Sequence, residues 1–444
     1  MKVAVVGAGI TGLAAGYEAV KAGAEVVVYE AADRAGGRIL TSELAGRPVD
    51  EGPDAFLARV PGALGLCREL GLDANLVSPT QRAAFVYSRG ALRELPQPNV
   101  LGVPLDFDSL AASGIISAPG VARARQEPDL DGPALVGDES VGGLVRRRLG
   151  DEVAERLVDP LIGGINASSM DNLSVQAAVP RLAEAAAHGP SLVRWLRRLV
   201  ASPGADPGAP VFYTLPGGLG GLAKELGDRL GDRLRLSSPV SDLNHLDADR
   251  VIITVPAARA GRLVAPLSET AAGLLGSIRY ASVVLVTLAF DARAVKHPLA
   301  GSGFLVPAVE GLSITACSWA SSKWAHLASP NTVIMRVSLG RYGDNELLYL
   351  SDEALLGVVM SDLETTMGLN ATPQHVRISR WEHSLPQYFP GHLELVTTIE
   401  QALSKDAPWV QVTGAWARGL GIPACIHQGR QAALAATNGA PGPR

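Results

Sequence analysis

Charged and aromatic residues are scarce in this chain of 444 residues. Charged side chains make up 19% of it, aromatic side chains make up 5%, and the formal net charge is −5. Proteins that bind nucleic acid usually carry a surplus of basic residues. We therefore expect no nucleic-acid partner for this protein.

Cysteine is rare as well. The three cysteines, Cys67, Cys317 and Cys425, lie far apart in the sequence, and the eight histidines form no pair at the spacing of metal ligands. Metal sites and disulfide frameworks both require closer or more regular spacing. We expect three free thiols, buried or half-buried in a reducing compartment, and no metal site.

Long apolar runs are missing too. No run approaches the ~20 apolar residues that a helix needs to cross a bilayer. The apolar stretch at the N-terminus lacks the charged region and cleavage site of a signal peptide, and it is predicted to be a strand. We expect a cytoplasmic protein without a transmembrane or targeting segment. Peripheral membrane contact, and the choice between monomer and homodimer, are left open by the sequence.

Apolar residues nevertheless make up 47% of the chain, enough for a large core, and its length predicts two or three domains. A loop rich in proline and glycine is expected at residues 202–210. Apolar periodicity predicts helices at residues 61–77, 141–149, 152–161, 175–187, 192–199, 217–230, 355–367 and 426–436. Apolar and β-branched runs predict strands at residues 251–255, 283–290, 312–319, 333–339 and 409–413.

The first thirty residues are the most informative part of the chain. Residues 3–6 predict a strand, residues 13–22 an alanine-rich helix, and residues 25–29 a second strand that is followed by Glu30. A strand, a glycine turn, a helix and a second parallel strand form a βαβ unit. Units of this kind bind dinucleotides.

The glycines of the turn have separate roles in such a unit. Gly7 allows the tight turn, Gly9 lets the backbone approach phosphate oxygens, and Gly12 lets the helix pack closely on the strand. The N-terminus of the helix favours the negative charge of a pyrophosphate. Glu30 is expected to accept hydrogen bonds from ribose hydroxyls.

Two more glycine-rich segments stand outside this unit. Gly36 and Gly37 precede Arg38, which predicts a second backbone approach and a cation near phosphate; the alternative is a surface turn with a solvated arginine. Residues 414–423 lie between a late strand and the last helix. Their amides are expected at the far end of an extended cofactor; the alternative is an ordinary strand-to-helix loop.

Short sequence motifs beyond the glycine turns occur in order along nearly the whole chain. They lie at residues 52–59, 146–153, 159–165, 215–219, 314–319, 323–324, 380–381, 385–388 and 419–426. With the glycine motifs, they resemble the FAD-dependent amine oxidase and protoporphyrinogen oxidase superfamily. Within it the chain is most similar to the porphyrinogen oxidases, and among these to the bacterial branch of coproporphyrinogen III oxidases.

This resemblance implies an α/β fold. A Rossmann-like FAD-binding domain of the glutathione-reductase and amine-oxidase type is combined with a mixed-sheet substrate domain and a helical subdomain. The FAD-binding domain is expected at residues 1–58, 206–260 and 395–444, and the substrate domain at residues 59–96 and 261–394. The helical subdomain, facing the substrate or a membrane, is expected at residues 97–205.

The resemblance also implies FAD as the cofactor, whose N5 carries the chemistry, and the sequence identifies no catalytic side chain. The residues expected to bind FAD are Gly7, Ala8, Gly9, Ile10, Thr11, Gly12, Glu30, Ala31, Gly37, Arg38, Gly52, Pro53, Asp54, Ala55, Val240, Trp381, Leu420, Gly421 and Ile422.

Substrate contacts are expected at Arg59, Ile165, Asn166 and Lys323. Arg59 is the first candidate to pair with a propionate, since it follows the turn expected beside the flavin; its alternative is a solvated surface arginine. Lys323 is the second candidate, with ordering of a water molecule near the flavin as another role. Trp381 is expected to pack on the flavin ring, and its alternative is packing in the core.

The implied reaction is the oxidation of a porphyrinogen to a porphyrin in haem biosynthesis, with oxygen as acceptor and release of peroxide. Coproporphyrinogen III is the expected substrate. The alternatives are protoporphyrinogen IX oxidase, an amine oxidase or carotenoid-type desaturase, and a flavin- or porphyrin-binding protein without turnover. Amine oxidases usually enclose the amine between paired aromatic side chains, of which this chain has few.

Two features depart from the family pattern. Relatives usually carry a tyrosine where this chain has Asn166, and Ser168 replaces a glycine nearby, so substrate contacts at this segment are expected to differ. The family also usually runs through a longer β-hairpin after Val240. Here Asp247 follows a few residues later, and the hairpin is expected to be missing.

Overall fold

The computed structural model describes residues 1–201 and 208–438, which divide into two compact units. Unit 1 combines Met1–Ser78, Pro210–Arg279 and the described part of His392–Arg444. Unit 2 combines the described part of Pro79–Ala209 with Tyr280–Gly391. Each unit is therefore built from separate stretches of the chain.

The longest segments that lie in a different unit from the one expected from the sequence are residues 59–78 and 261–279. Both belong to unit 1 rather than to the substrate part. The physical reason is helix packing, which ties each segment to a helix near the C-terminus. The packed pairs are α2 (Pro61–Glu69) with α17 (Ile422–Asn438), and α13 (Glu269–Ser277) with α16 (His392–Asp406).

A parallel sheet of five strands forms the centre of unit 1. Its strand order is β11–β2–β1–β12–β18. In β1 the residues from Val3 to Val6 are all buried, as is typical of a parallel strand covered on both faces. Val5 pairs with Val28 on one side and with Ile252 on the other. The strands are β1 (Lys2–Val6), β2 (Glu25–Tyr29), β11 (Leu234–Arg235), β12 (Arg250–Ile253) and β18 (Val410–Val412).

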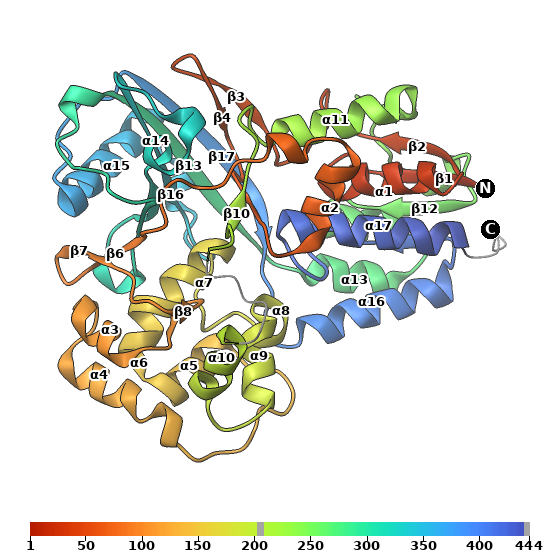
Figure 1. Ribbon diagram of the computed structural model, residues 1–444. Coiled ribbons are helices and arrows are strands. Elements are labelled where there is room, and N and C mark those ends of the chain that lie inside the picture. Colours follow the sequence, from red (N-terminus) through yellow and green to blue (C-terminus); the bar gives the residue numbers. More distant parts are fainter. Residues whose placement is uncertain (202–207, 439–444) are drawn as a thin grey trace. The chain divides into compact units, whose positions relative to one another are not determined.

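Helices α1 (Ile10–Lys21) and α17 lie side by side in unit 1, drawn in red and blue in Figure 1. They approach closely because Gly429 has no side chain. A Cβ built on Gly429 would lie 2.1 Å from the carbonyl oxygen of Thr11. Unit 1 also contains α11 (Gly220–Leu230), α12 (Ala257–Val264) and the short strands β3 (Thr41–Leu44), β4 (Arg47–Asp50), β5 (Phe56–Leu57) and β10 (Phe212–Tyr213).

The elements predicted for unit 1 are present, with shifted ends. The helix predicted at residues 61–77 ends at Glu69, because Gly71 adopts a left-handed conformation (φ 74°) that a helix does not continue. The last helix begins at Ile422, four residues earlier than predicted. Residues 236–249, all of them described, contain no strand between β11 and β12, in line with the missing hairpin.

A mixed sheet of seven strands forms the centre of unit 2, with the order β17–β13–β16–β15–β14–β6–β7. All neighbours are antiparallel except β14 and β6, which are parallel. Helix α15 (Asp352–Met367) covers one face, where Val286 and Val337 belong to the same apolar cluster as Leu363. The strands are β6 (Phe85–Ser88), β7 (Ala91–Glu94), β13 (Tyr280–Asp291), β14 (Gly303–Leu305), β15 (Ile314–Ser318), β16 (Thr332–Leu339) and β17 (His375–Pro386).

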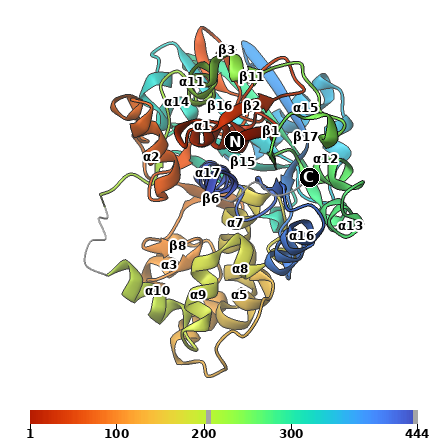
Figure 2. The same cartoon turned by 90° about the vertical axis from the view of Figure 1, so that its right-hand side faces the viewer.

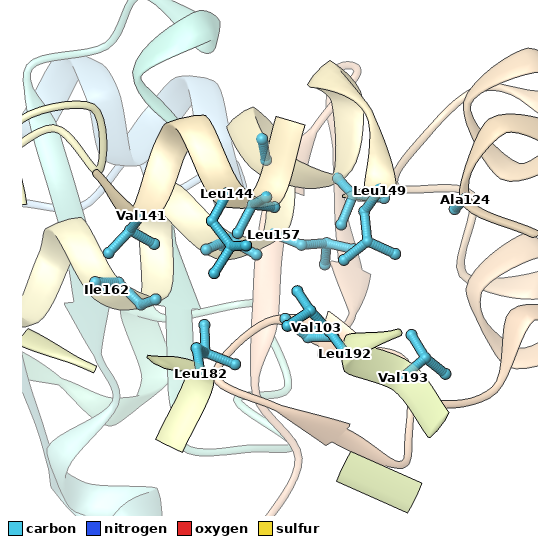
Figure 3. Close-up of a cluster of buried hydrophobic side chains, with 14 of the residues drawn as sticks. Val103, Ala124, Val141, Leu144, Leu149, Leu157, Ile162, Leu182, Leu192 and Val193 are labelled. Atoms are coloured by element: carbon cyan, nitrogen blue, oxygen red, sulfur yellow. The ribbon is translucent and has the colours of Figure 1, made fainter. Parts of the chain in front are cut away.

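A group of helices in unit 2 gathers around a separate apolar cluster (Figures 2 and 3). Leu144, Leu157, Leu182 and Leu192, from four different segments, are buried together there. The group also contains the short strands β8 (Asn99–Val100) and β9 (Val103–Pro104). Its helices are α3 (Phe107–Ser113), α4 (Ala118–Arg125), α5 (Val141–Leu149), α6 (Asp151–Val153), α7 (Asp159–Asn166), α8 (Val175–Ala178), α9 (Pro180–Ala187) and α10 (Leu192–Val200).

Proline explains two differences between predicted and observed helices in unit 2. The helix predicted at residues 175–187 is broken at Val179, because the ring of Pro180 disfavours helical geometry in the residue before it. The helix predicted at residues 152–161 contains a π-helical stretch, Ala154–Val158. Pro160 follows it and has no N–H to donate, so the regular hydrogen-bond ladder is interrupted.

Most of the loop predicted at residues 202–210 lies outside the described residues. Within the described part of the chain, no helix is long and apolar enough to cross a membrane. The three cysteines are free and buried, as predicted. Burial raises the pKa of Cys67 and that of Cys425 to about 11, so both thiols stay protonated at neutral pH.

A buried carboxylate anchors α10 in the helical group. Glu127 is fully buried, and its Oε1 accepts a hydrogen bond from the backbone N–H of Leu192 at 2.7 Å. Its Oε2 accepts from the hydroxyl of Ser191 at 2.7 Å and from the backbone N–H of Val193 at 3.3 Å. The Nε of Arg148 lies 4.0 Å from Oε1. Glu127 therefore satisfies the amides at the start of α10, which no residue within that helix can do.

We expect Glu127→Ala to lower the free energy of unfolding by about 3 kcal/mol, because the substitution leaves Arg148 and two amides buried without their acceptor. Urea unfolding followed by circular dichroism measures the loss, and hydrogen exchange should accelerate in α10. Asp129→Ala is the matched control, since Asp129 pairs with Arg194 on the surface. An equal effect of the two substitutions would contradict the assigned role of Glu127.

Candidate active site: a dinucleotide cradle in unit 1

The turn between β1 and α1 is shaped by glycines that the fold itself requires. Gly7 has φ 101°, and a Cβ built on it would lie 2.9 Å from Cγ1 of Val255. A Cβ built on Gly12 would lie 1.8 Å from the carbonyl oxygen of Gly7. The hydroxyl of Thr254 donates to this same carbonyl at 3.0 Å. Any side chain at either position therefore collides with the strand ends.

Gly9 differs from these two glycines. It is the N-cap of α1 with φ −66° and ψ 173°, an extended conformation that any residue adopts. A Cβ built on it would meet no heavy atom within 4 Å. The protein itself does not need glycine at this position. The open space at the N-terminus of a helix suits a phosphate group that approaches the backbone.

Glu30 follows β2 at the same edge of the sheet. Its Oε2 accepts a hydrogen bond from the backbone N–H of Ala8 at 2.7 Å, and its Oε1 accepts from that of Ala32 at 2.9 Å. Each carboxylate oxygen can accept a second hydrogen bond. Glu30 thus stabilises the glycine turn, and its carboxylate can still accept hydrogen bonds from hydroxyl groups. This fits the ribose of a dinucleotide.

The segment with the second glycine pair lies against this turn. The backbone N–H of Gly36 donates to the carbonyl of Ala8 at 2.8 Å, and Gly36 forms a β-bridge with Gly9. Gly37 has φ 58°, and a Cβ built on it would lie 3.2 Å from the Cα of Gly9. The segment therefore forms a second wall of the space beside Gly9.

Two arginines, Arg34 and Arg38, belong to the same segment as Gly36 and Gly37. The sequence analysis singled out Arg38 and missed Arg34, whose guanidinium donates to the carbonyl of Gly37 at 2.6 Å. Burial raises the pKa of the Cys425 thiol, and the nearby positive charge of Arg38 acts in the opposite direction. Arg34 shapes the segment, and Arg38 brings positive charge toward the start of α17.

The segment at residues 50–55 has a structural residue at its start. Asp50 is buried, and its Oδ1 accepts from the hydroxyl of Thr41 and from the backbone N–H of Leu219. These bonds join the β3–β4 hairpin to the start of α11. Gly52 is buried, while Pro53 is exposed and Asp54 and Ala55 are half-buried. Their contact with FAD stays a prediction.

Arg59 is an exposed residue of unit 1, placed between β5 and α2. Val240, also in unit 1, is half-buried, and its carbonyl accepts from the guanidinium of Arg259 at 3.2 Å. The nearby Ser238 donates its N–H to the carbonyl of Glu30 at 2.7 Å. The segment that leads to Val240 therefore runs along the end of β2, beside the predicted ribose site.

The loop between β18 and α17 is the third part of the cradle. Gly414 and Gly419 have φ 142° and 123°, so the loop is irregular at both ends. Among the described residues, no protein acceptor faces the backbone N–H groups of Leu420, Gly421 and Ile422. These amides lie at the start of α17, where the helix dipole favours an electronegative ligand atom.

The order of strands in the sheet brings the glycine turn and this loop to the same edge. Both follow parallel strands, and only β12 separates β1 from β18. Two strand spacings correspond to about 10 Å. An extended dinucleotide is long enough to meet the amides at both positions.

Two of the predicted substrate residues, Ile165 and Asn166, are neighbours in unit 2 but differ in exposure. Ile165 is 56% exposed at the end of α7, whereas Asn166 is buried and its Nδ2 donates to the carbonyl of Ile162 at 2.8 Å. The amide of Gln387 donates to the carbonyl of Asn166 at 3.0 Å. Ala167 follows with φ 48° and ends the helix. The helix end thus presents Ile165, and it turns the side chain of Asn166 inward.

Lys323 and Trp381 also belong to unit 2. Lys323 ends helix α14 (Ala320–Lys323), and its Nζ lies 4.8 Å from the ring centre of Trp324. Trp381 is half-buried in β17 and pairs with Val283. The preceding residue, Arg380, donates to the carbonyl of Leu348 beside α15, so Trp381 lies on the opposite face of the sheet. Contacts of these residues with flavin or substrate stay predictions.

Known proteins resemble this chain over nearly its whole length. The family model described as flavin containing amine oxidoreductase matches residues 10–436. The coproporphyrinogen III oxidase of Bacillus subtilis (strain 168) is 32% identical over 460 aligned residues, which cover 97% of this chain and 96% of the relative. The coproporphyrinogen III oxidase of Mycobacterium tuberculosis (strain H37Rv) is 34% identical, covering 95% and 94% of the two chains.

A solved structure shows the same similarity. The crystal structure of "Putative protoporphyrinogen oxidase" from Exiguobacterium sp. 255-15 is 29% identical, with a TM-score of 0.87 and coverage of 98% of each chain. The expected fold class is thereby confirmed, as is the expected flavoprotein family. Together with the cradle at Gly9, these similarities lead to one conclusion: the chain belongs to the flavin containing amine oxidoreductases.

Proposed function

We propose that this chain is an FAD-dependent oxidase that converts coproporphyrinogen III to coproporphyrin III. One observation carries the proposal: the relatives from B. subtilis and M. tuberculosis, matched over 95% or more of this chain, are both named coproporphyrinogen III oxidase. Membership of a flavin-containing family supplies the class of cofactor. Protoporphyrinogen IX is the second candidate substrate, favoured by the name of the Exiguobacterium protein.

The cradle in unit 1 supports a dinucleotide form of the flavin. The adenosine and pyrophosphate half would occupy the open space beside Gly9, with Glu30 accepting from the ribose. The flavin half would reach the amides of Leu420, Gly421 and Ile422. We assign the other FAD contacts predicted from the sequence to the same cofactor, those of Trp381 and of residues 52–55 included.

The redox balance of the reaction needs an acceptor. Coproporphyrinogen III loses six electrons and six protons to become the porphyrin, and three oxygen molecules would take them up as three molecules of hydrogen peroxide. The bound flavin supplies the acceptor for each hydride equivalent. The residues of the chain therefore act by binding and positioning. Oxygen as acceptor and a cytoplasmic location are part of the proposal.

The substrate is a flat apolar ring system with propionate arms, which calls for an apolar surface and a few cations. Arg59 is the first candidate for a propionate partner, because it is exposed and follows the segment at residues 52–55. Lys323 is the second candidate. Ile165 offers apolar surface at the end of α7.

We expect the purified protein to show a flavin absorption spectrum and to oxidise coproporphyrinogen III in air. Rising porphyrin fluorescence and peroxide release, close to three molecules of peroxide for each porphyrin, measure the reaction. Faster oxidation of protoporphyrinogen IX would assign the second candidate substrate instead. A flavin-loaded protein that oxidises neither porphyrinogen would contradict the proposal, and oxidation of simple amines would replace it.

Gly9→Ala should weaken FAD binding about tenfold while the protein still folds. The added methyl group meets no protein atom but enters the space proposed for the pyrophosphate. Its cost at the helix N-cap is at most about 1 kcal/mol. Titration of the flavin-free protein with FAD measures affinity, and thermal unfolding of the same preparation measures stability.

Gly12→Ala is the contrasting variant, because its methyl group would collide with the carbonyl of Gly7. It should lower stability before any ligand is added. Unchanged FAD affinity in Gly9→Ala would show that the pyrophosphate lies elsewhere.

Arg59→Ala should raise the KM for coproporphyrinogen III about tenfold, with flavin content unchanged, because a charge-assisted hydrogen bond to a propionate is lost. Steady-state kinetics and the ratio of flavin to protein absorbance measure the two effects. Arg68→Ala, an exposed arginine on α2, is the matched control and should leave KM unchanged. Parallel loss of flavin and activity in Arg59→Ala would count against a role in substrate binding.

A further inference from the structure

Side chains of two helices, α16 and α17, form hydrogen bonds with the backbone of the loop between β18 and α17. The loop contains the irregular residues 414–420, whose backbone groups lie outside any sheet ladder or helix. Buried backbone groups of such a loop need partners from elsewhere. The side chains of His392 and Gln428 supply them, and the sequence analysis assigned a role to neither residue.

His392 is the first residue of α16 and is only 4% exposed. Its Nε2 lies 2.9 Å from the carbonyl oxygen of Trp416 and 3.0 Å from that of Ala417. Carbonyl oxygens only accept hydrogen bonds, so Nε2 must carry a proton and donate to both. One buried imidazole thus fixes two consecutive carbonyls of the loop.

Gln428 holds the next part of the loop from α17. Its Nε2 donates to the carbonyl of Gly419 at 3.0 Å, and its Oε1 accepts from the backbone N–H of Arg418 at 2.9 Å. The thiol of Cys425 lies 3.5 Å from the carbonyl of Leu420. Four carbonyls of the loop therefore have partners on the protein side, those of Trp416, Ala417, Gly419 and Leu420.

The amides that follow remain available. The N–H groups of Leu420, Gly421 and Ile422 meet no protein acceptor among the described residues. Leu420 is half-buried and Gly421 is exposed, so a ligand can reach their amides at the start of α17, where the helix dipole favours an electronegative ligand atom.

We propose that His392 is a positioning residue for the flavin half of the cofactor. By holding the carbonyls of Trp416 and Ala417, it keeps the amides of Leu420, Gly421 and Ile422 in one arrangement before the cofactor binds. This inference rests on the proposed function, since it takes the loop as the flavin side of the FAD site. A loop fixed in advance loses less conformational entropy on binding.

The test compares FAD with ADP as ligands of the flavin-free full chain. ADP is the half expected at Gly9, so a defect confined to the loop should affect FAD alone. His392→Leu removes the donor and should raise the Kd for FAD at least tenfold, while the Kd for ADP changes less than twofold. His392→Gln places an amide donor near the position of Nε2 and should restore FAD affinity to within about threefold of the unmodified protein.

A control variant distinguishes an effect on the loop from a general loss of protein stability. Leu403→Ala creates a cavity at another buried position of α16, eleven residues along the helix and about 16 Å away. It should leave both dissociation constants within twofold. If His392→Leu does not fold, His392→Asn replaces it, because the shorter amide falls short of the two carbonyls. Fluorescence quenching of FAD and calorimetric titration with ADP give the constants.

A second variant distinguishes failure of this inference from failure of the proposed site. Gly421→Val adds a side chain to an exposed position whose built Cβ lies 3.8 Å from Pro423, an ordinary contact. Unchanged FAD affinity in this variant would show that the loop is not the flavin site. If Gly421→Val binds FAD more weakly but the folded His392 variant binds it unchanged, the flavin site stands and the role of His392 is overturned. Equal losses for FAD and ADP in the His392 variant would also overturn it.

Discussion

The close approach of backbone to backbone around α1 is the constraint on which the rest of unit 1 depends. Gly12 packs on the carbonyl of Gly7, and Gly429 packs on the carbonyl of Thr11. These contacts seat α1 against the end of β1 on one side and against α17 on the other. An added methyl group at Gly12 would push α1 away from the turn after β1, and one at Gly429 would separate two helices that come from opposite ends of the chain.

This packing explains why the cradle is assembled from distant segments. The glycine turn and the loop before α17 each come directly after a strand of the same parallel sheet. The wall at Gly36 and Gly37 is joined to the glycine turn by the β-bridge between Gly9 and Gly36. Parallel strands place their carboxyl ends together, and α/β proteins bind ligands at that edge. The irregular loops can then carry binding groups, because the helices and strands behind them are rigid.

The glycines of the cradle divide into two physical classes. Gly7 and Gly12 are glycine because the protein leaves no room for a Cβ, whereas Gly9 is glycine although the protein leaves ample room. The first class serves the fold, and the second indicates a ligand. The loop before α17 shows a related division, with its carbonyls bound to His392 and Gln428 and its amides left for a ligand.

The sequence by itself determined the βαβ unit, the dinucleotide site and the flavoprotein family, because local spacing encodes them: glycines at Gly7, Gly9 and Gly12, a strand pattern on either side, and Glu30. Only the tertiary structure decided the rest. It placed residues 59–78 and 261–279 in unit 1, turned Asn166 inward, and brought His392 to the loop before α17. These outcomes depend on contacts between residues far apart in the chain, for which the local pattern carries no signal.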